Sequence, residues 1–349
     1  MALSGKGWTK QTRSGLDALI VDGAGKNLPA VFDFDNTIVC GDIGEATLAM
    51  LALDGVIRKD DIPHSIAPSF TSPDGKRVSL SDCADLTVHY EELLGSSLHQ
   101  KNDFAPLSSG YVWAVEIMQG LSPLDVIRAT EKVHAQSEPF TRKSIEVTSG
   151  VSSYPVPFFY PEMLELIAEL LTNRFDVWVV SASNVWTVRW MVLRALNPAL
   201  AALGCKHGIA PDRVVGVSTL LADRDGRLWK DHLLVRSEMN YARMDEDYLS
   251  GLKLTARINY PASTYSGKVA CILDLIGKRP YLSGGDSPGD IPMLAWSENR
   301  LWIARLGKHA YQREMETAAA NSGGGGWLVQ PTSCADAAGF IGQTSRDGM

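Results

Sequence analysis

The second half of the chain alternates between two hydrophobic patterns, one typical of buried strands and one typical of amphipathic helices. Residues 162–173 place Leu164, Ile167 and Leu171 on one face with the period of an α-helix. Residues 176–180 form a nearly continuous apolar run, which is typical of a strand buried on both faces. The alternation continues, with helices expected at 185–196, 268–276 and 310–320, strands at 214–220, 279–283 and 301–306, and a hairpin turn at Asp225-Gly226. Strands and helices in alternation predict an α/β fold with a Rossmann-like, doubly wound parallel sheet.

One further strand of this kind, at residues 30–34, lies far upstream of the others. Between it and residue 160 the pattern is mainly helical and includes helices expected at 44–53 and 121–135. This block of about 120 residues is too long for a connection in an α/β unit, which typically has ~2–6 residues. We therefore expect a mainly α-helical cap domain at residues 41–156, inserted in a core made of residues 1–40 and 157–349.

Composition argues against two kinds of partner. Lys and Arg number 33 against 40 Asp and Glu, a net charge of −7, whereas a nucleic-acid-binding surface needs clustered basic residues. No stretch reaches the ~18–20 uncharged apolar residues of a membrane-spanning helix, and the first residues lack the apolar core of a secretion signal. We expect no nucleic-acid partner and no membrane span, in a cytoplasmic protein or in a periplasmic one whose leader is absent from this sequence.

The cysteines are few and far apart, with no Cys-x-x-Cys pair among them. They are Cys40, Cys83, Cys205, Cys271 and Cys334. An odd, scattered set predicts reduced thiols rather than a disulfide framework or a zinc site.

Polar residues follow three of the expected strands, at the carboxyl ends where open α/β sheets bind their ligands. These residues are Asp33 and Asp35 after the strand at 30–34, Ser181, Ser183 and Asn184 after 176–180, and Asp286 and Asp290 after 279–283. The last two lie in a glycine-rich loop. Because strand ends meet at one edge of a parallel sheet, we expect these groups to share one site.

The four carboxylates of this site would converge with few groups to offset their charge. At an effective dielectric constant near 20, two unit charges ~4 Å apart repel by about 4 kcal/mol. Hard oxygen ligands of this kind suit Mg²⁺, which also bridges to phosphate. Lys268, at the start of the helix expected at 268–276, supplies a second cation. The sequence therefore predicts a Mg²⁺ site with an ammonium group beside it.

The order of these groups resembles the signature of the haloacid dehalogenase-like phosphohydrolases: Asp-x-Asp-x-Thr, then Ser, then Lys, then Gly-Asp-x-x-x-Asp. The resemblance covers residues 30–306, and the helical insertion is similar to the cap of the phosphoserine phosphatase-like branch. Within this branch, residues 16–20 leading into 30–33, and residues 179–183, look similar to bacterial phosphorylcholine phosphatases. Gly289 departs from the pattern, since many relatives carry asparagine before the last aspartate.

The resemblance implies a Mg²⁺-dependent phosphatase that works through an aspartyl-phosphate intermediate. Asp33 would be the nucleophile, and Asp35 would protonate the leaving alkoxide and then take a proton from water. Ser181 and Lys268 would hold the transferring oxygens, and the Thr37 hydroxyl would shape the substrate loop. The metal ligands would be Asp33, the Asp35 backbone carbonyl, Asp286 and Asp290, the last either binding the ion or orienting Lys268.

The expected substrate is a small phosphorylated metabolite, because a large cap that closes over the site excludes macromolecules. Asp42 and Glu45 are placed to face a positively charged end of this substrate, although the macrodipole also favours an acid at a helix start. Ser183 and Asn184 complete the expected substrate-binding set. The aromatic residues of the cap and its hinges either pack as core or cage an ammonium by cation–π attraction; they are Tyr90, Phe104, Tyr111, Trp113, Phe158, Phe159 and Tyr160.

Three functions remain open from the sequence. The first is hydrolysis of a small phosphomonoester that carries an amino or ammonium group, such as phosphoserine or phosphorylcholine. The second is transfer of the phosphoryl group from the aspartate to an acceptor other than water. The third, a binding protein without activity, is disfavoured by the complete set of acid, nucleophile, lysine and metal ligands. Neither the identity of the substrate nor the oligomeric state follows from the sequence.

Overall fold

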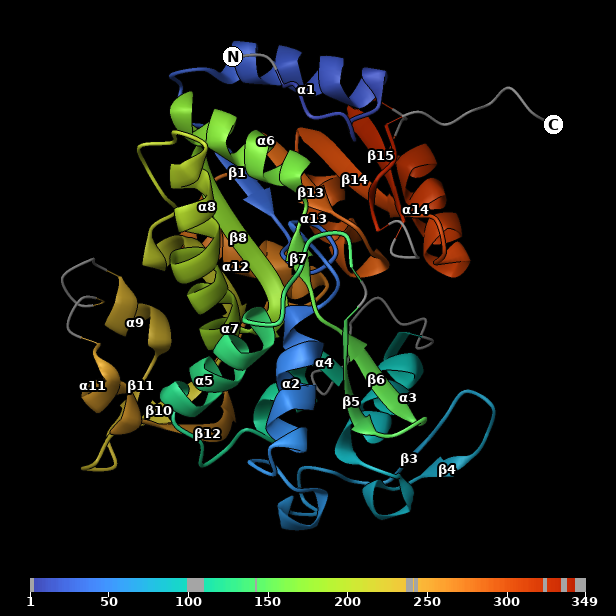
Figure 1. Cartoon of the computed structure of the whole chain (residues 1–349), viewed down its shortest axis with the longest axis vertical. Coiled ribbons are helices and arrows are strands. Elements are labelled where there is room, and N and C mark those ends of the chain that lie inside the picture. The colour runs from blue at the N-terminus through green and yellow to red at the C-terminus, as the bar shows by residue number, and fades with distance from the viewer. Residues whose placement is uncertain are drawn as a thin grey trace.

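A seven-stranded sheet with the order β16-β15-β14-β13-β1-β8-β9 forms the centre of the protein (Figure 1). The computed structural model describes residues 3–98, 110–141, 143–236, 241, 244–322, 325–333 and 338–342. Neighbouring strands of the sheet are parallel except for the pair β15 and β16. The strands are β1 (Pro29–Phe32), β8 (Asp176–Asn184), β9 (Val214–Val217), β13 (Leu282–Gly285), β14 (Asn299–Arg305), β15 (Trp327–Ser333) and β16 (Gly339–Phe340).

Successive side chains of the inner strands enter different hydrophobic cores on the two faces of the sheet. Ala30 and Phe32 of β1 belong to the cluster that includes helices on one face, whereas Val31 between them packs with helices on the other. The first face is covered by α1 (Lys10–Gly23), α6 (Pro161–Thr172), α7 (Val185–Trp190) and α8 (Asn197–Ala202), and the second by α12 (Ser266–Leu275), α13 (Ile291–Trp296) and α14 (His309–Asn321). Both faces are therefore buried, which explains the continuous apolar runs and confirms the predicted doubly wound α/β fold.

An inserted cap separates β1 from α6. The chain leaves and re-enters the core through the antiparallel pair β2 (Val39–Cys40) and β7 (Phe158–Phe159). Between them lie α2 (Ile43–Leu53), α3 (Leu86–Leu98), α4 (Gly110–Glu116) and α5 (Pro123–His134), with the hairpins β3 (Phe70–Thr71)–β4 (Arg77–Val78) and β5 (Ser144–Thr148)–β6 (Ser152–Pro155). We refer to the elements from α2 to β6 as the cap. The hairpins were not expected from the helical pattern, and Gly75 and Gly150 supply the positive φ angles that their turns require.

Hydrogen bonds on two sides of the cap help to join it to the core. The buried hydroxyls of Thr47 on α2, Thr130 on α5 and Thr187 on α7 form a chain of contacts of 3.3 and 3.1 Å. On the other side, the backbone N–H groups of Gly120 and Leu254 donate 2.8 Å hydrogen bonds across to the Leu254 and Leu121 carbonyls. Leu254 belongs to a second, three-stranded antiparallel sheet inserted in the core after β9. This sheet comprises β10 (Thr219–Ala222), β11 (Leu228–Trp229) and β12 (Lys253–Ile258), beside α9 (Asp231–Val235) and α11 (Glu246–Ser250).

Two of the expected strands differ from the structure. The single strand expected at 214–220 is divided between β9 and β10, because the Ser218 carbonyl accepts a 2.8 Å bond from the Asn259 N–H and the chain turns into the second sheet. The strand expected at 279–283 begins only at Leu282, since Pro280 has no N–H to donate. The helix expected at 185–196 consists of α7 and a π-helical segment, Met191–Leu196. The hairpin turn at Asp225-Gly226 is confirmed and joins β10 to β11.

The cysteines agree with the expectation of reduced thiols as far as the described residues go. Cys40, Cys83, Cys205 and Cys271 are buried and make no disulfide, while Cys334 lies outside the described residues. Among the described residues, no helix combines the length and apolar character that crossing a membrane requires.

Candidate active site

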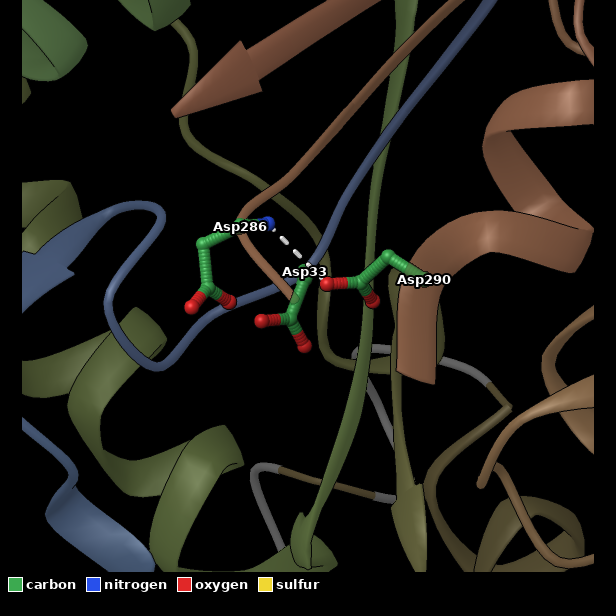
Figure 2. Close-up of side chains that lie close together, drawn as sticks. All are labelled: Asp33, Asp286 and Asp290. Carbon is green, nitrogen blue, oxygen red and sulfur yellow. Dashed lines mark hydrogen bonds between the residues drawn. The ribbon is translucent and has the colours of Figure 1, made fainter. Parts of the chain in front are cut away.

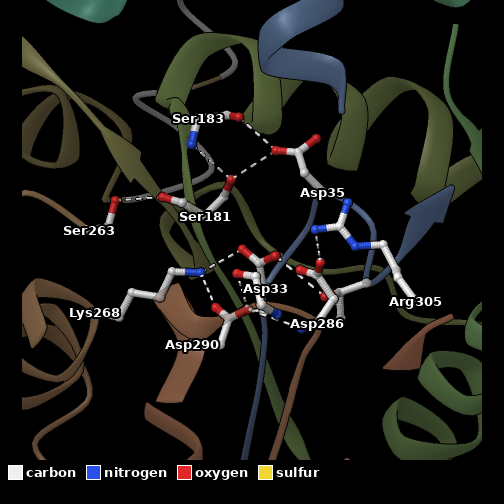
Figure 3. Close-up of polar contacts among 11 residues, drawn as sticks. Asp33, Asp35, Ser181, Ser183, Ser263, Lys268, Asp286, Asp290 and Arg305 are labelled. Carbon is white, nitrogen blue, oxygen red and sulfur yellow. Dashed lines mark hydrogen bonds and ion pairs between the residues drawn. The ribbon is translucent and has the colours of Figure 1, made fainter. Parts of the chain in front are cut away.

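A buried lysine joins two of the predicted carboxylates at the carboxyl edge of the sheet (Figure 3). Lys268 Nζ lies 2.6 Å from Asp33 Oδ1 and 2.6 Å from Asp290 Oδ1. Asp33 follows β1 and Asp290 follows β13, so two neighbouring strands aim their acids at the first turn of α12. Lys268 is only 3% exposed and Asp33 is 6% exposed. Residues more than 230 positions apart in the sequence therefore meet as the sequence analysis predicts.

Asp33, Asp286 and Asp290 surround one small space from which a divalent cation could be held (Figure 2). One carboxylate oxygen from each residue lies within 4.8 Å of the others, and all three residues are buried. Asp290 is the most engaged of the three, because its Oδ2 also accepts hydrogen bonds from the N–H groups of Asp286 (3.0 Å) and Ser287 (3.2 Å). An all-carboxylate donor set fits Mg²⁺.

The side chain of Asp35 lies between the core and the cap. Its Oδ1 accepts a hydrogen bond of 2.6 Å from the N–H of Ile43, at the start of α2. Its Oδ2 accepts a hydrogen bond of 2.6 Å from the Ser183 hydroxyl, at the end of β8. Gly44 makes this close approach feasible, because a Cβ there would overlap Ser183 Oγ.

The hydroxyl and amide groups that were expected at the site divide into two sets. Ser183 lines the cavity beside Asp35, whereas Ser181 is fully buried behind it and lies 3.4 Å from Asp35 Oδ2. Thr37 is fully buried and donates to Asp33 Oδ2 at 3.4 Å. The side-chain oxygen of Asn184 accepts a 2.8 Å bond from the Trp186 N–H and so caps α7. Thr37 and Asn184 therefore make internal contacts, which differ from the substrate contacts expected of them.

A cavity of about 140 Å³ opens above these groups, and its wall carries more acids than bases. Its charged residues are Asp33, Asp35, Asp42, Glu45, Asp286 and Asp290, against Lys268, Arg305 and Lys308. Asp42 and Glu45 line the side opposite the sheet, where Asp42 caps α2 and Glu45 accepts a 3.2 Å bond from the Tyr90 hydroxyl. A wider cavity of about 420 Å³ lies next to it, and both are lined by Asn36, Asp42, Glu45, Arg305 and Lys308.

The aromatic residues expected to cage an ammonium are mostly core. Trp113 and Tyr160 are buried, and the Trp113 ring N–H donates to the Ile66 carbonyl at 2.8 Å. Tyr90 and Tyr111 line a side pocket next to Glu45, and Tyr111 also lines the active-site cavity. Phe104 lies outside the described residues.

Burial raises the pKa of several carboxyl groups of the cavity. It raises the pKa of Asp33 to about 7, against the opposing charge of Lys268, and it raises the pKa of Asp35 to about 8, with Asp42 adding to the effect. Burial also raises the pKa of Asp42 and of Asp286 well above the ordinary range. The same burial opposes the charge on Lys268, but Asp290 and Asp33 outweigh it and raise its pKa. Near neutral pH, and without a metal, Asp35 thus holds a proton that it could donate.

Glu45 is expected to make the metal-free protein less stable as the pH rises. Burial, and then the charge of Asp35, raise the pKa of Glu45 to about 7, while the unfolded chain ionises near 4.5. The contribution of Glu45 to the free energy of unfolding is therefore fully present below pH 4.5 and is lost as the pH rises to about 7. In EDTA, the melting temperature of Glu45→Gln should fall less between pH 4.5 and pH 7.5 than that of the parent. The surface variant Glu138→Gln serves as the control, and equal falls for all three proteins would refute the effect.

Sequence reasoning missed Arg305 and Tyr311, which line the cavity together with the exposed Lys308. Arg305 ends β14, and its Nη2 lies 2.7 Å from Asp286 Oδ2 (Figure 3). Tyr311 on α14 packs beneath it, with 5.4 Å between the guanidinium carbon and the ring centroid. A signal for Arg305 was present, since it lies at the carboxyl end of the strand expected at 301–306.

The strand order, the cap and the convergence of the four motifs agree with a phosphatase of the haloacid dehalogenase-like superfamily, the class that the motifs predict. No family model matches the chain. It is 27% identical over 315 residues to the phosphorylcholine phosphatase of Pseudomonas aeruginosa, an alignment that covers 87% of this chain and 82% of the relative. This similarity confirms the predicted branch.

A solved structure shows the same fold over almost the whole chain. It is that of a conserved functionally unknown protein from Anaerococcus prevotii, with a TM-score of 0.60 and 18% sequence identity. The match covers 98% of this chain and 97% of the other. The core and the cap are thus found together in another protein.

Proposed function

We propose that this phosphatase is a Mg²⁺-dependent hydrolase of a small phosphomonoester that carries an amino or ammonium group, and that it works through an aspartyl-phosphate on Asp33. The observation that carries the proposal is the Lys268 ammonium, held 2.6 Å from both Asp33 and Asp290 on the wall of the cavity. An anionic nucleophile can approach a phosphate dianion only where fixed cations offset their repulsion. Lys268 supplies one such cation at the nucleophile itself.

In the proposed reaction, Asp33 attacks phosphorus and the bond to the leaving oxygen breaks. Asp35, protonated because of its burial, gives its proton to the leaving alkoxide. It then takes a proton from the water that attacks the aspartyl-phosphate, which releases inorganic phosphate and restores Asp33. Lys268 holds the transferring oxygens. Ser181, which is buried behind the cavity wall, acts through its contact with Asp35, and the Ser183 hydroxyl keeps Asp35 in position.

The residues proposed to hold Mg²⁺ are Asp33, the Asp35 backbone carbonyl and Asp286. The bound ion would supply positive charge that offsets the phosphoryl oxygens. Both oxygens of Asp290 already accept hydrogen bonds, one from Lys268 and the other from the N–H groups of the 286–287 loop. We therefore assign Asp290 to orienting Lys268, the second of the two roles that the sequence leaves open.

The substrate proposal rests on the charge of the cavity. Its wall carries six carboxyl groups and three basic groups, so it favours a phosphoester whose organic part is positively charged. Asp42 and Glu45 are proposed to face that part, and Thr37 to keep its contact with the nucleophile. The relative from P. aeruginosa is named for phosphorylcholine, which meets this description. Phosphoserine also carries an ammonium group, but with a carboxylate beside it. In this proposal residues 41–156 determine specificity, and residues 1–40 with 157–349 carry the reaction.

The function is tested by phosphate release from a panel of phosphorylated metabolites, with Mg²⁺ or with EDTA. We expect release only with Mg²⁺, and at least about tenfold higher kcat/KM for phosphorylcholine or phosphoserine than for glycerol phosphate, which has no cationic group. Equal rates for the three esters would refute the substrate class. An excess of acceptor alcohol tests the phosphotransferase alternative, which would yield a new phosphoester in place of free phosphate.

Asp35→Asn is expected to separate the two chemical steps. The activated leaving group of p-nitrophenyl phosphate needs no proton, so the variant should release about one equivalent of p-nitrophenol and then stall, because water is no longer activated. Steady-state turnover should fall by about 10²–10⁴-fold. Rapid mixing measures the burst, and acid quenching traps the phosphorylated protein. Steady turnover at the parent's rate would show that Asp35 is not the acid and base.

A further inference from the structure

Arg305 is a second, partly buried cation of the active site, supplied by a strand that carries none of the four motifs. Its side chain is 14% exposed and lines the cavity together with Lys268 and Asp33. The ion pair with Asp286 and the ring of Tyr311 hold the guanidinium in place. The fold thus fixes an arginine beside the acids where the proposed chemistry takes place.

The position of Arg305 complements that of Lys268. Figure 3 shows the lysine and the arginine on opposite sides of Asp33, the lysine in contact with Asp33 and Asp290 and the arginine in contact with Asp286. A phosphoryl group transferred to Asp33 would therefore have a cation on each side. The planar guanidinium matches two phosphate oxygens at once, whereas an ammonium acts as a point charge.

We propose that Arg305 binds the phosphoryl group of the substrate directly, by donating hydrogen bonds to its non-bridging oxygens. This inference rests on the proposed function. It goes beyond that function because it assigns a substrate-binding role to a residue outside the motifs.

A similar arginine elsewhere in the chain shows that the ion pair alone does not require a ligand. Arg213 pairs with Asp176 at 3.0 Å and lies 4.7 Å from the centroid of the Trp178 ring. This pair sits at the start of β8, at the opposite edge of the sheet, and Arg213 does not line the active-site cavity. The two arginines differ in what they face, so Arg213 is a matched control for Arg305.

The test compares Arg305→Met, Arg305→Lys and Arg213→Met with the parent protein. Calorimetry measures the Kd of inorganic phosphate in saturating Mg²⁺ and, separately, the Kd of Mg²⁺ alone, while p-nitrophenyl phosphate gives kcat and KM. We expect Arg305→Met to weaken phosphate binding by about 10–100-fold, since hydrogen bonds to charged groups are lost. Arg305→Lys should recover part of the lost phosphate affinity, because lysine keeps the positive charge but lacks the paired N–H donors of the guanidinium. Arg213→Met should bind phosphate like the parent.

Each outcome bears on the proposal. Unchanged phosphate affinity in Arg305→Met, with weaker Mg²⁺ binding, would overturn it and show that the arginine acts only through Asp286. If Arg305→Met fails to fold, parent-like phosphate affinity in Arg305→Lys would overturn the proposal equally. A parent protein that hydrolyses no phosphomonoester and binds no phosphate would refute the proposed function itself. A parent that does both, with variants that match it, would refute only the role of Arg305.

Discussion

Replacing Asp33 by asparagine is expected to lower phosphate release from p-nitrophenyl phosphate by at least about 10⁴-fold. The carboxylate is the proposed nucleophile, and an amide of the same shape has no anionic oxygen with which to attack phosphorus. The fold should survive, because the substitution is nearly isosteric and Lys268 keeps its ion pair with Asp290. Phosphate release and thermal melting, measured on the same preparation, separate loss of chemistry from loss of structure.

Asp176→Asn is the matched control for this experiment. Asp176 begins β8, next to β1 but at the opposite end of the sheet, and it pairs with Arg213. This variant should hydrolyse p-nitrophenyl phosphate like the parent. Activity of Asp33→Asn close to that of the parent would exclude Asp33 as the nucleophile.

Lys268→Met is expected to lower the free energy of unfolding by about 3–5 kcal/mol at pH 8 in EDTA, because it removes one partner of a buried ion-pair cluster. Methionine fills a similar volume but leaves Asp33 and Asp290 without their shared cation. The loss should be smaller at pH 5, where protonation of Asp33, whose pKa burial raises to about 7, relieves the repulsion. Urea denaturation at the two pH values measures both effects.

Two further variants make the Lys268 prediction specific. Lys308 lines the same cavity but is exposed, so Lys308→Met should change the free energy of unfolding by no more than about 0.5 kcal/mol. Adding Asp290→Asn to Lys268→Met should restore part of the lost stability, because it removes one of the two carboxylates that Lys268→Met leaves without a cation. If Lys268→Met is no less stable than Lys308→Met, the lysine does not hold this cluster together.

The residues of the site that could be predicted are those that belong to short sequence motifs at the ends of predicted strands. Asp33 and Asp286 each follow an apolar run that reads as a buried strand, and the parallel sheet brings such ends together. The chemistry of the residues then indicates what they could bind. Arg305 also ends a predicted strand, but a single arginine there carries no pattern of its own, so its place beside Asp286 became visible only in the structure.

The parts that could not be predicted depend on contacts between distant or irregular segments. β12 has a mixed polar sequence, and its backbone pairs with Leu121 of the cap, far away along the chain. The contact between Glu45 and Tyr90 likewise depends on how α2 and α3 pack within the cap. No periodicity encodes such pairings, because they arise from packing of whole elements. For the same reason, the sequence did not show which of Ser183 and Asn184 faces the cavity and which caps the helix that follows.

Two short hydrogen bonds to the Asp35 carboxyl group link the proposed proton donor to both the cap and the core. One partner, Ile43, opens the first helix of the cap, and the other, Ser183, ends a strand of the core. The carboxyl group is therefore held between the cap and the core, and its orientation depends on how the cap is positioned on the core. An ester too bulky for the cap to close over it would lose its binding contacts and would also leave the Asp35 proton misplaced. Selectivity would then act on bond cleavage and not only on substrate entry.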